Sequence, residues 1–217
     1  MGFGKGLLEL LFPSKCPFCA ALLGKGEELC GDCRKKLSWL AGTAGETKVE
    51  FVDRCVSALL YDELTREAVR RYKFMGVSQH KVAFGKFMAQ CVEMQFTEGF
   101  DLITWIPLHR ERLAERGYDQ AKLLALEVSV HRGIPALAVL EKIRRTVAQS
   151  GIEKDEERRA NVLDSYRLRE GIAVEGKRIL LMDDVVTTGA TMAEAARALR
   201  MAGAAEVCAV TLAKARK

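Results

Sequence analysis

Residues 179–191 read Ile-Leu-Leu-Met-Asp-Asp-Val-Val-Thr-Thr-Gly-Ala-Thr, and this stretch decides how the chain is expected to fold. Its first four residues are apolar without alternation, which is typical of a central strand in a parallel sheet covered by helices on both faces. Asp183 and Asp184 stand where that strand ends, and a helical pattern begins at Met192. In open α/β sheets, ligands bind outside the carboxyl ends of the strands. The stretch therefore predicts a strand, a ligand-binding loop and a helix, in that order.

The loop after the acidic pair combines small side chains with hydroxyl groups. Thr187, Thr188 and Thr191 carry hydroxyls that can donate hydrogen bonds, and Gly189 lets the backbone come close to a ligand. The backbone N–H groups of such a loop and the positive end of the helix dipole favour a bound phosphate. Carboxylates beside a phosphate site suit a sugar phosphate, which carries hydroxyls at one end and a dianion at the other. The plain alternative is a strand with an acidic turn and an N-capping threonine.

The order of these residues resembles the signature of the type I phosphoribosyltransferases at all thirteen positions. In that family the acidic pair holds the ribose 2- and 3-hydroxyls of phosphoribosyl pyrophosphate, and the following loop wraps its 5-phosphate. The resemblance implies an α/β fold, with a parallel sheet flanked by helices and a small hood over the site. It assigns a catalytic role to Asp183 and Asp184, and substrate binding to Val186, Thr187, Thr188, Gly189, Ala190 and Thr191. It also implies Mg²⁺, which bridges pyrophosphate and hydroxyls while pyrophosphate is displaced from ribose C1.

The composition is that of an ordinary globular protein. The chain has 217 residues, of which 49% are hydrophobic, and a net charge of +5. This length fits one domain plus a small appendage, and the charge is compatible with anionic ligands, including nucleic acid, without requiring them. No apolar run approaches the length of a membrane span, and Leu7–Phe12, interrupted by Glu9, does not read as a secretory signal. We therefore expect a cytoplasmic protein that begins with a short amphipathic helix.

Four of the seven cysteines form two Cys-x-x-Cys pairs with ten residues between them: Cys16, Cys19, Cys30 and Cys33. Two such pairs can place four thiolates tetrahedrally around one zinc ion, and metal ligation supplies folding energy to a segment too short for its own core. The alternatives are a redox pair, which lacks a surrounding βαβ pattern, and disulfides, which are rare in the cytoplasm. The cysteines predict a zinc module over residues 1–45, followed by an α/β domain over residues 46–217. Cys55, Cys91 and Cys208 lie in apolar patterns typical of core thiols.

A cluster of arginines follows the strand expected at residues 102–107. Arg110, Arg112 and Arg116 would lie at the carboxyl end of that strand, on the side of a polyphosphate opposite the 5-phosphate. Arginine suits phosphate because its planar guanidinium donates several hydrogen bonds. The alternative is a solvated, salt-bridged start to the following helix, since Glu111 and Glu115 interleave with the arginines.

Other elements follow from apolar periodicity. Further strands are expected over residues 51–61, 134–143 and 206–213, another outside the core sheet over 162–169, and helices over 62–74 and 81–96. Residues 37–50 read as a linker, and the polar stretch 144–160 reads as a disordered loop or a functional lid. The basic face of helix 62–74, which carries Arg66, Arg70, Arg71 and Lys73, is interpreted mainly as solvated.

The whole pattern resembles the ComF/GntX family from Phe12 to Ala213. The resemblance rests on the paired cysteines, Pro-Leu-His-Arg at 107–110, Arg-Gly-Tyr-Asp-Gln at 116–120, Gln149 with Arg-Arg-Ala-Asn-Val at 158–162, and the phosphoribosyl motif. In some bacteria, members of this family are needed for DNA uptake in natural transformation. The chain departs from the family at Asp119, where asparagine is usual. A carboxylate cannot donate as the amide does, which puts contact with an anion at this position in doubt.

Two classes of function remain open at this point. One is a transferase, or a binder of phosphoribosyl pyrophosphate or a related sugar phosphate, that needs Mg²⁺. The other is a non-catalytic DNA-binding or regulatory component of the transformation machinery, with single-stranded DNA as ligand. The zinc module is then a candidate docking site for a competence helicase or another uptake protein, and homodimers are common among proteins of this fold. Steep salt dependence would indicate nucleic acid, and dependence on Mg²⁺ would indicate the sugar phosphate.

Overall fold

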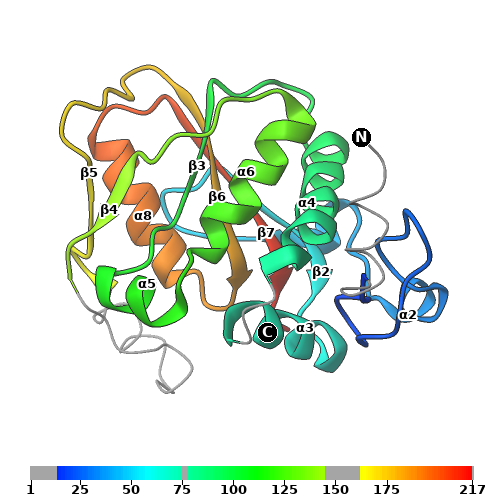
Figure 1. The fold of residues 1–217 in the computed structure, drawn as a ribbon. Coiled ribbons are helices and arrows are strands. Elements are labelled where there is room, and N and C mark those ends of the chain that lie inside the picture. The colour runs from blue at the N-terminus through cyan, green and yellow to red at the C-terminus, as the bar shows by residue number, and fades with distance from the viewer. Residues whose placement is uncertain (1–13, 75–77, 145–161, 217) are drawn as a thin grey trace, which may run out of the picture.

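A computed structural model describes residues 14–74, 78–144 and 162–216 of the chain. Its centre is a five-stranded sheet in the order β1-β2-β7-β6-β3, parallel except for the short strand β1 (Figure 1). The strands are β1 (Glu46–Thr47), β2 (Arg54–Leu60), β3 (Leu102–Trp105), β6 (Arg178–Val186) and β7 (Glu206–Lys214). The strand expected at residues 179–182 is confirmed as a central strand, and it continues through the acidic pair.

Helices lie on both faces of this sheet (Figure 1). One face is covered by α4 (Lys81–Gln95) and α6 (Gln120–Arg132), and the other by α8 (Ala190–Met201). The other helices are α2 (Gly31–Lys36), α3 (Glu63–Phe74) and α5 (Arg110–Arg116), with 3-10 turns at Gly42–Gly45 and Ser78–His80. Successive residues of a strand point to opposite faces. Leu180 and Met182 accordingly pack in the cluster that includes α4 and α6, whereas Ile179 and Leu181 pack in the cluster that includes α8. The unbroken apolar run thus reflects a strand that is buried on both sides.

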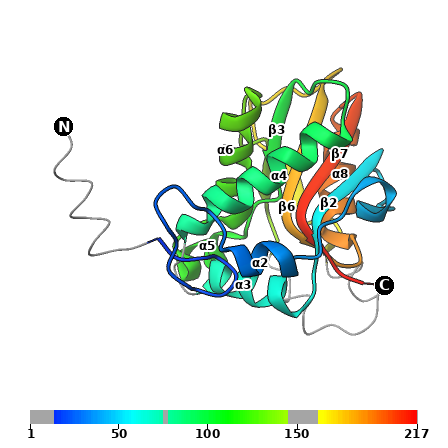
Figure 2. The ribbon, with the colours of Figure 1, turned by 90° about the vertical axis from the view of Figure 1, so that its right-hand side faces the viewer.

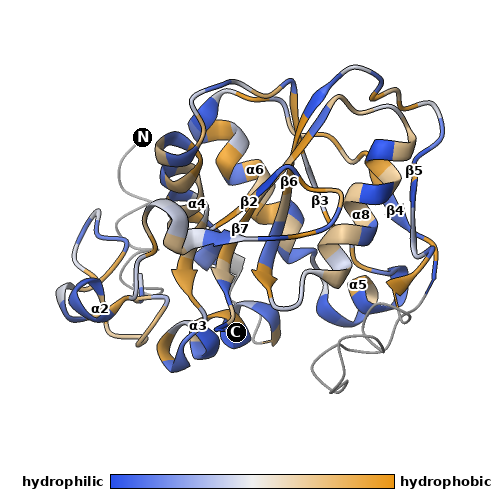
Figure 3. Cartoon of the chain, turned by 180° about the vertical axis from the view of Figure 1, so that it is seen from behind, coloured by the Kyte–Doolittle hydropathy of each residue, from blue (hydrophilic) through white to orange (hydrophobic). Residues whose placement is uncertain are grey.

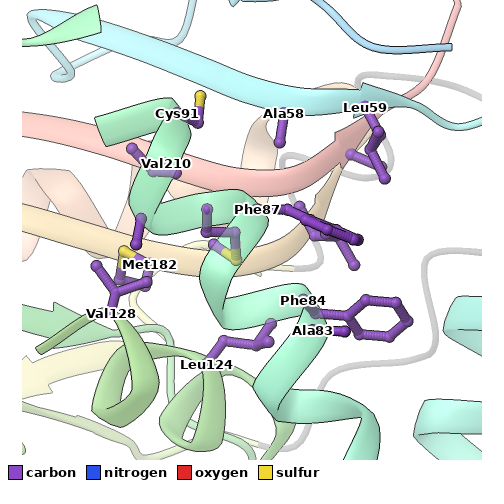
Figure 4. Packing of buried hydrophobic residues seen from close by; sticks show 14 of the residues in the cluster. Ala58, Leu59, Ala83, Phe84, Phe87, Cys91, Leu124, Val128, Met182 and Val210 are labelled. Atoms are coloured by element: carbon purple, nitrogen blue, oxygen red, sulfur yellow. The ribbon is translucent and has the colours of Figure 1, made fainter. Parts of the chain in front are cut away.

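The core on the α4 and α6 face is assembled from distant parts of the chain. Figure 4 shows Met182 and Val210 of the sheet near Val128 of α6 and Phe87 of α4. The central strands are mostly hydrophobic, while α3 carries hydrophilic colours (Figure 3). The three remaining cysteines, expected to be core thiols, are buried and free: Cys55, Cys91 and Cys208. The predicted class of architecture, a largely parallel sheet between helices, is therefore confirmed.

A second, two-stranded sheet stands apart from the main one, and we refer to it as the hood. It pairs β4 (Leu140–Lys142) with β5 (Tyr166–Leu168) in antiparallel register, so the expectation of a strand outside the core sheet at residues 162–169 is confirmed. The strand expected at 134–143 is confirmed only over Leu140–Lys142, and it lies in the hood rather than in the main sheet. This segment touches the main sheet only around Ile103, whose N–H donates to the Pro135 carbonyl at 2.8 Å. Proline has no N–H to extend a ladder, and the chain turns away into the hood.

The interpretation of residues 37–50 as a linker is also wrong. Trp39 makes an isolated bridge to Leu59, and β1 pairs antiparallel with β2, so this stretch forms the edge of the main sheet. Its small residues are used for close packing rather than for flexibility. A Cβ added at Gly45 would lie 2.9 Å from the Ser57 carbonyl oxygen, which is too close for any other residue. The amphipathic helix expected near the N-terminus and the polar loop at 144–160 fall almost entirely on residues 1–13 and 145–161, outside the described residues.

The segment that carries the paired cysteines packs against α3 and α4 (Figure 2). The ring of Phe18 meets that of Phe84 edge to face, with centroids 5.6 Å apart. An Arg71 guanidinium N–H donates to the Pro17 carbonyl at 3.0 Å and to the Phe18 carbonyl at 2.5 Å, and Lys86 pairs with Glu28. The buried side chains of this segment belong to the same apolar cluster as α3, α4 and α6. The cysteine segment therefore shares its core with the α/β domain.

Candidate functional site

The acidic pair lies at the carboxyl end of β6, at the edge where parallel sheets bind ligands. Asp184 is buried, and its Oδ1 forms an ion pair with the ammonium group of Lys73 at 2.7 Å. The backbone N–H of Asp184 donates to Oδ1 of Asp183 at 2.8 Å. Because successive residues of a strand point to opposite faces, Asp184 faces an internal cation and Asp183 faces the loop that follows.

The electrostatics of the pair favour a bound cation. Removal of Asp183 from water raises its pKa from 3.8 to about 8, the neighbouring Asp184 adds to the rise, and Lys73 opposes it. Neighbouring carboxylates resist simultaneous ionisation unless positive charge compensates them. Magnesium is commonly held by one or two carboxylates together with water and substrate phosphates. The two carboxylates at the end of β6 match this usual set of magnesium ligands.

The loop after the pair encloses a cavity of about 40 Å³. Its lining consists of Asp183, Val185, Val186, Thr187, Gly189, Ala190, Thr191 and Met192. Gly189 is the N-cap of α8 with a φ of 84°, a conformation that disfavours other residues, and it brings no capping side chain. The start of α8 thus lies at this cavity, and a helix N-terminus is a favourable position for an anion. Of the predicted phosphate contacts, Thr188 alone is missing from this lining, and its Oγ1 instead accepts from the Ala190 N–H at 3.4 Å.

Lys73 is the site residue that sequence reasoning missed, since the basic face of α3 was interpreted mainly as solvated. Arg66 and Arg70 are indeed exposed, but Lys73 points inward with only 23% of its side chain accessible. The position carries one usable signal. Lys73 lies four residues after the buried Val69 and next to the buried Tyr72, and so borders the apolar face of the helix.

The Arg-Gly-Tyr-Asp-Gln motif at 116–120 fastens the last turn of α3. The Tyr118 hydroxyl donates to the Tyr72 carbonyl, and the Tyr72 hydroxyl donates to the Gln120 carbonyl at 3.1 Å. Arg116 donates to Gln120 Oε1 at 2.8 Å, and its guanidinium lies 4.7 Å from the ring centroid of Phe74. Because Lys73 lies between Tyr72 and Phe74, these contacts fix the backbone from which its side chain extends. We call this set of contacts the clasp.

Asp119 is the N-cap of α6, and both of its carboxylate oxygens accept from the backbone. Oδ2 accepts from the Leu108 N–H and Oδ1 from the Lys122 N–H, each at 3.0 Å. An asparagine offers a single acceptor oxygen, so Asp119→Asn is expected to lower the free energy of unfolding by about 1–2 kcal/mol. Urea denaturation measures this loss. Affinity for a sugar phosphate should be equal or higher, and a large affinity loss at unchanged stability would show that Asp119 contacts the ligand.

The remaining cations of the site come from α5 and the hood. Arg110 is exposed at the first position of α5, and Arg112 is half-buried. Lys142 of β4 lies with its ammonium group 5.1 Å from the ring centroid of Tyr166. Burial lowers the pKa of Lys142 to about 8, nearby Arg112 lowers it further, and Asp183 opposes them. Lys142 was not among the predicted site residues, because only the antiparallel pairing of the hood turns it toward the end of β6.

The paired cysteines form a second site. The ligand atoms of Cys16, Cys19, Cys30 and Cys33 all lie within 4.8 Å of one another. A zinc ion with four sulfur ligands at about 2.3 Å requires sulfur atoms about 3.8 Å apart. The Sγ atoms of Cys19 and Cys30 are 3.6 Å apart, so small adjustments would complete the tetrahedron. The donor set fits structural zinc.

Within the part of the chain that the structure describes, no helix is both long and apolar enough to cross a membrane.

Two family models match the chain. Residues 114–217 match the model of the phosphoribosyl transferase domain, and residues 7–45 match that of the double zinc ribbon domain. Competence protein F of Haemophilus influenzae is 26% identical over 215 residues, which cover 94% of this chain and 91% of that protein.

Two further relatives are more similar in sequence. Competence protein ComFC of Streptococcus pneumoniae is 30% identical over 184 residues, covering 84% of this chain and 79% of that protein. DNA utilization protein YhgH of Salmonella typhi is 30% identical over 200 residues, covering 89% of this chain and 81% of that protein. A zinc ribbon ahead of a phosphoribosyl transferase domain, together with these relatives, shows that the chain belongs to the ComF family.

Proposed function

We propose that the protein binds phosphoribosyl pyrophosphate, or a closely related sugar phosphate, together with Mg²⁺ at the end of β6. The observation that carries the proposal is that two carboxylates at the end of β6 are followed directly by a loop and a helix start that line one small cavity. Asp183 and Asp184 would accept hydrogen bonds from the ribose hydroxyls. The loop from Val186 to Thr191 would hold the 5-phosphate. The Thr188 hydroxyl accepts from the Ala190 N–H and would donate its own O–H to the ligand.

The diphosphate on ribose C1 would then lie on the side of the site occupied by α3, α5 and the hood. Arg116 interacts electrostatically with Asp184, and Arg112 and Lys142 interact with each other. Arg116 would bind the diphosphate, with its guanidinium held in place by the hydrogen bond to Gln120. Arg110 is solvent-exposed in the unliganded protein and would contact the diphosphate from the start of α5.

The chemistry that this arrangement supports is nucleophilic displacement at ribose C1. A nucleophile would form a bond to C1 while the bond from C1 to the diphosphate oxygen breaks. The electron pair of the broken bond leaves with pyrophosphate, and the proton of the nucleophile passes to solvent. Bound Mg²⁺ would supply charge compensation for that leaving group. The protein would contribute positioning of the ribose and cations for the developing negative charge, which are the main sources of catalysis when no covalent step falls to the side chains.

A second candidate function is suggested by the names of the relatives. Competence protein ComFC and DNA utilization protein YhgH are named for competence and for the use of DNA. In a non-catalytic component of DNA uptake, the loop would bind a backbone phosphate of single-stranded DNA, and the zinc module would dock a partner such as a helicase. The net charge of +5 is compatible with this reading.

The test of the proposed function is calorimetric titration of phosphoribosyl pyrophosphate in the presence of Mg²⁺. The double change Asp183→Asn/Asp184→Asn is expected to weaken binding by about 100-fold or more, because the hydrogen bonds lost involve charged acceptors. Glu170→Gln/Glu175→Gln is the matched control, since it removes two exposed carboxylates from the turn that leads into β6.

The wild-type result separates the two candidate functions. If the folded, zinc-loaded protein does not bind the sugar diphosphate, the first proposal is wrong. Binding of single-stranded DNA that falls steeply between low and moderate salt would then favour the second.

A further inference from the structure

Lys73 forms an ion pair with Asp184 inside the candidate site. Its ammonium group lies 2.7 Å from Oδ1 of Asp184, and the two side chains are only 23% and 10% accessible. It also interacts electrostatically with Asp183 and Tyr61. A lysine this close supplies the unliganded acidic pair with positive charge from within the protein.

The position of Lys73 is set by contacts on both sides of it. The clasp holds Tyr72 through two hydrogen bonds to the 118–120 segment, and the guanidinium of Arg116 lies over the ring of Phe74. Lysine nevertheless reaches its partner through a flexible four-carbon stem that ends in three rotatable donors. The backbone at residue 73 is therefore fixed, while its ammonium group can turn to another acceptor nearby.

The ion pair conflicts with the role proposed for Asp184. Oδ1 of Asp184 already accepts from Lys73, and a cation ligated by the same carboxylate would lie close to the ammonium group and repel it. We therefore expect a bound metal to displace the ammonium group from Asp184. The diphosphate on C1 is adjacent to the ribose hydroxyls and remote from the 5-phosphate, which makes it the nearest new anion for a displaced cation.

We propose that Lys73 is an exchangeable counter-ion that neutralises Asp184 in the empty site and contacts the C1 diphosphate when the sugar and metal bind. This inference rests on the proposed function and adds to it a binding residue with two states. It makes opposite predictions for two ligands. Lys73 competes with a metal that binds alone, and it assists a ligand that carries the diphosphate.

The experiment compares Lys73→Met with the wild type, using three probes: Mn²⁺ alone, phosphoribosyl pyrophosphate with Mg²⁺, and ribose 5-phosphate with Mg²⁺. Methionine keeps an unbranched stem of similar length without the charge. Arg70→Met is the matched control, because Arg70 is an exposed cation on the same helix, paired with Glu67. Thermal unfolding establishes that each variant is folded, and Lys73→Gln serves if the methionine variant is not.

For Lys73→Met we expect Mn²⁺ to bind about tenfold more tightly, because its competitor on Asp184 is gone. Phosphoribosyl pyrophosphate should bind about 10–100-fold more weakly, as is typical for loss of a charge-assisted hydrogen bond. Ribose 5-phosphate, which lacks the diphosphate, should bind equally well or better. Arg70→Met should leave all three affinities within about twofold.

Equal losses for the two sugar phosphates would overturn the inference, because they would show that Lys73 only supports the shape of the site. An unchanged Mn²⁺ affinity would overturn it as well, since no competition would then exist. If the wild type binds no sugar diphosphate, the proposed function fails. The Mn²⁺ titration still decides whether Lys73 competes at Asp184.

Discussion

Replacing Cys33 with serine is expected to release the zinc ion, unfold the cysteine segment and destabilise the α/β domain with it. Binding of structural zinc provides about 10–16 kcal/mol of apparent free energy in small zinc modules, and loss of one thiolate ligand removes much of this free energy. The effect should spread because the segment and α4 share one core, in which Phe18 packs on Phe84. Metal analysis should find about one zinc per wild-type chain and less in the variant, and thermal unfolding should show a lower midpoint.

Cys91→Ser is the matched control, because Cys91 is a buried thiol of the same core outside the zinc site. It should keep its zinc and lose only about 1–2 kcal/mol, the usual cost of burying a hydroxyl in place of an apolar group. A zinc-free Cys33→Ser protein that unfolds at the wild-type temperature would contradict the assignment. The same shared core bears on the proposed division into residues 1–45 and 46–217. A chain that begins at residue 46 would expose the face of Phe84, and its stability tests that division directly.

Affinity for the sugar diphosphate and Mg²⁺ is expected to rise with pH through the neutral range. The pKa of Asp183 is raised to about 8, mainly by desolvation, so below that pH the free protein holds a proton that a bound metal must displace. Each pH unit below about 8 should then weaken binding by about tenfold. The rise should level off above this range, because Lys142, whose pKa is lowered to about 8, loses its charge there.

The stability of the unliganded protein should change in the opposite direction. A carboxyl whose pKa is raised on folding stabilises the fold fully below its ordinary pKa of 3.8, and this contribution is lost as the pH rises through about 8. Asp183 thus opposes folding under the conditions that favour ligand binding. Measurements above about pH 6 keep the zinc thiolates ionised and separate this effect from loss of metal.

Calorimetry in buffers of different ionisation enthalpy measures the proton directly. At neutral pH, binding of the ligand with Mg²⁺ should release about one proton more from the wild type than from Asp183→Asn, in which position 183 cannot titrate. The comparison cancels protons released by the phosphates of the ligand, because these are common to both proteins. Equal release from the two proteins would mean that Asp183 is already ionised in the free site.

The main elements near the site follow from local sequence. An apolar run followed by Asp183 and Asp184 specified a central strand that ends in carboxylates, because only a strand buried on both faces tolerates four apolar residues in succession. The spacing of Cys16, Cys19, Cys30 and Cys33 likewise specified a metal cluster, because each pair must present two sulfurs from one turn. In both cases the information lies within a few consecutive residues.

The pairing of the hood strands could not be predicted from the local sequence. Residues 134–143 are apolar enough for a core strand. They nevertheless make only an isolated bridge to the main sheet, at Ile103, and β4 pairs with β5 instead. An apolar run does not specify its partner, since the competing pairings differ in contacts that are distant in sequence. The edge strand β1 was hidden for the same reason, because Gly, Ala and Thr are equally typical of linkers and of tight packing.

By itself, the sequence determined the central strand, the acidic pair, the small-residue loop that follows it and the cluster of four cysteines. Only the tertiary structure decided which cations meet the acidic pair. Lys73, from a helix more than a hundred residues earlier in the chain, reaches Asp184, and Lys142 of the hood faces the same end of β6. The physical reason is that the structure of a short motif is set by residues adjacent to it along the backbone. The direction of a long charged side chain depends instead on how its helix or strand is rotated and held, and here the clasp sets that rotation.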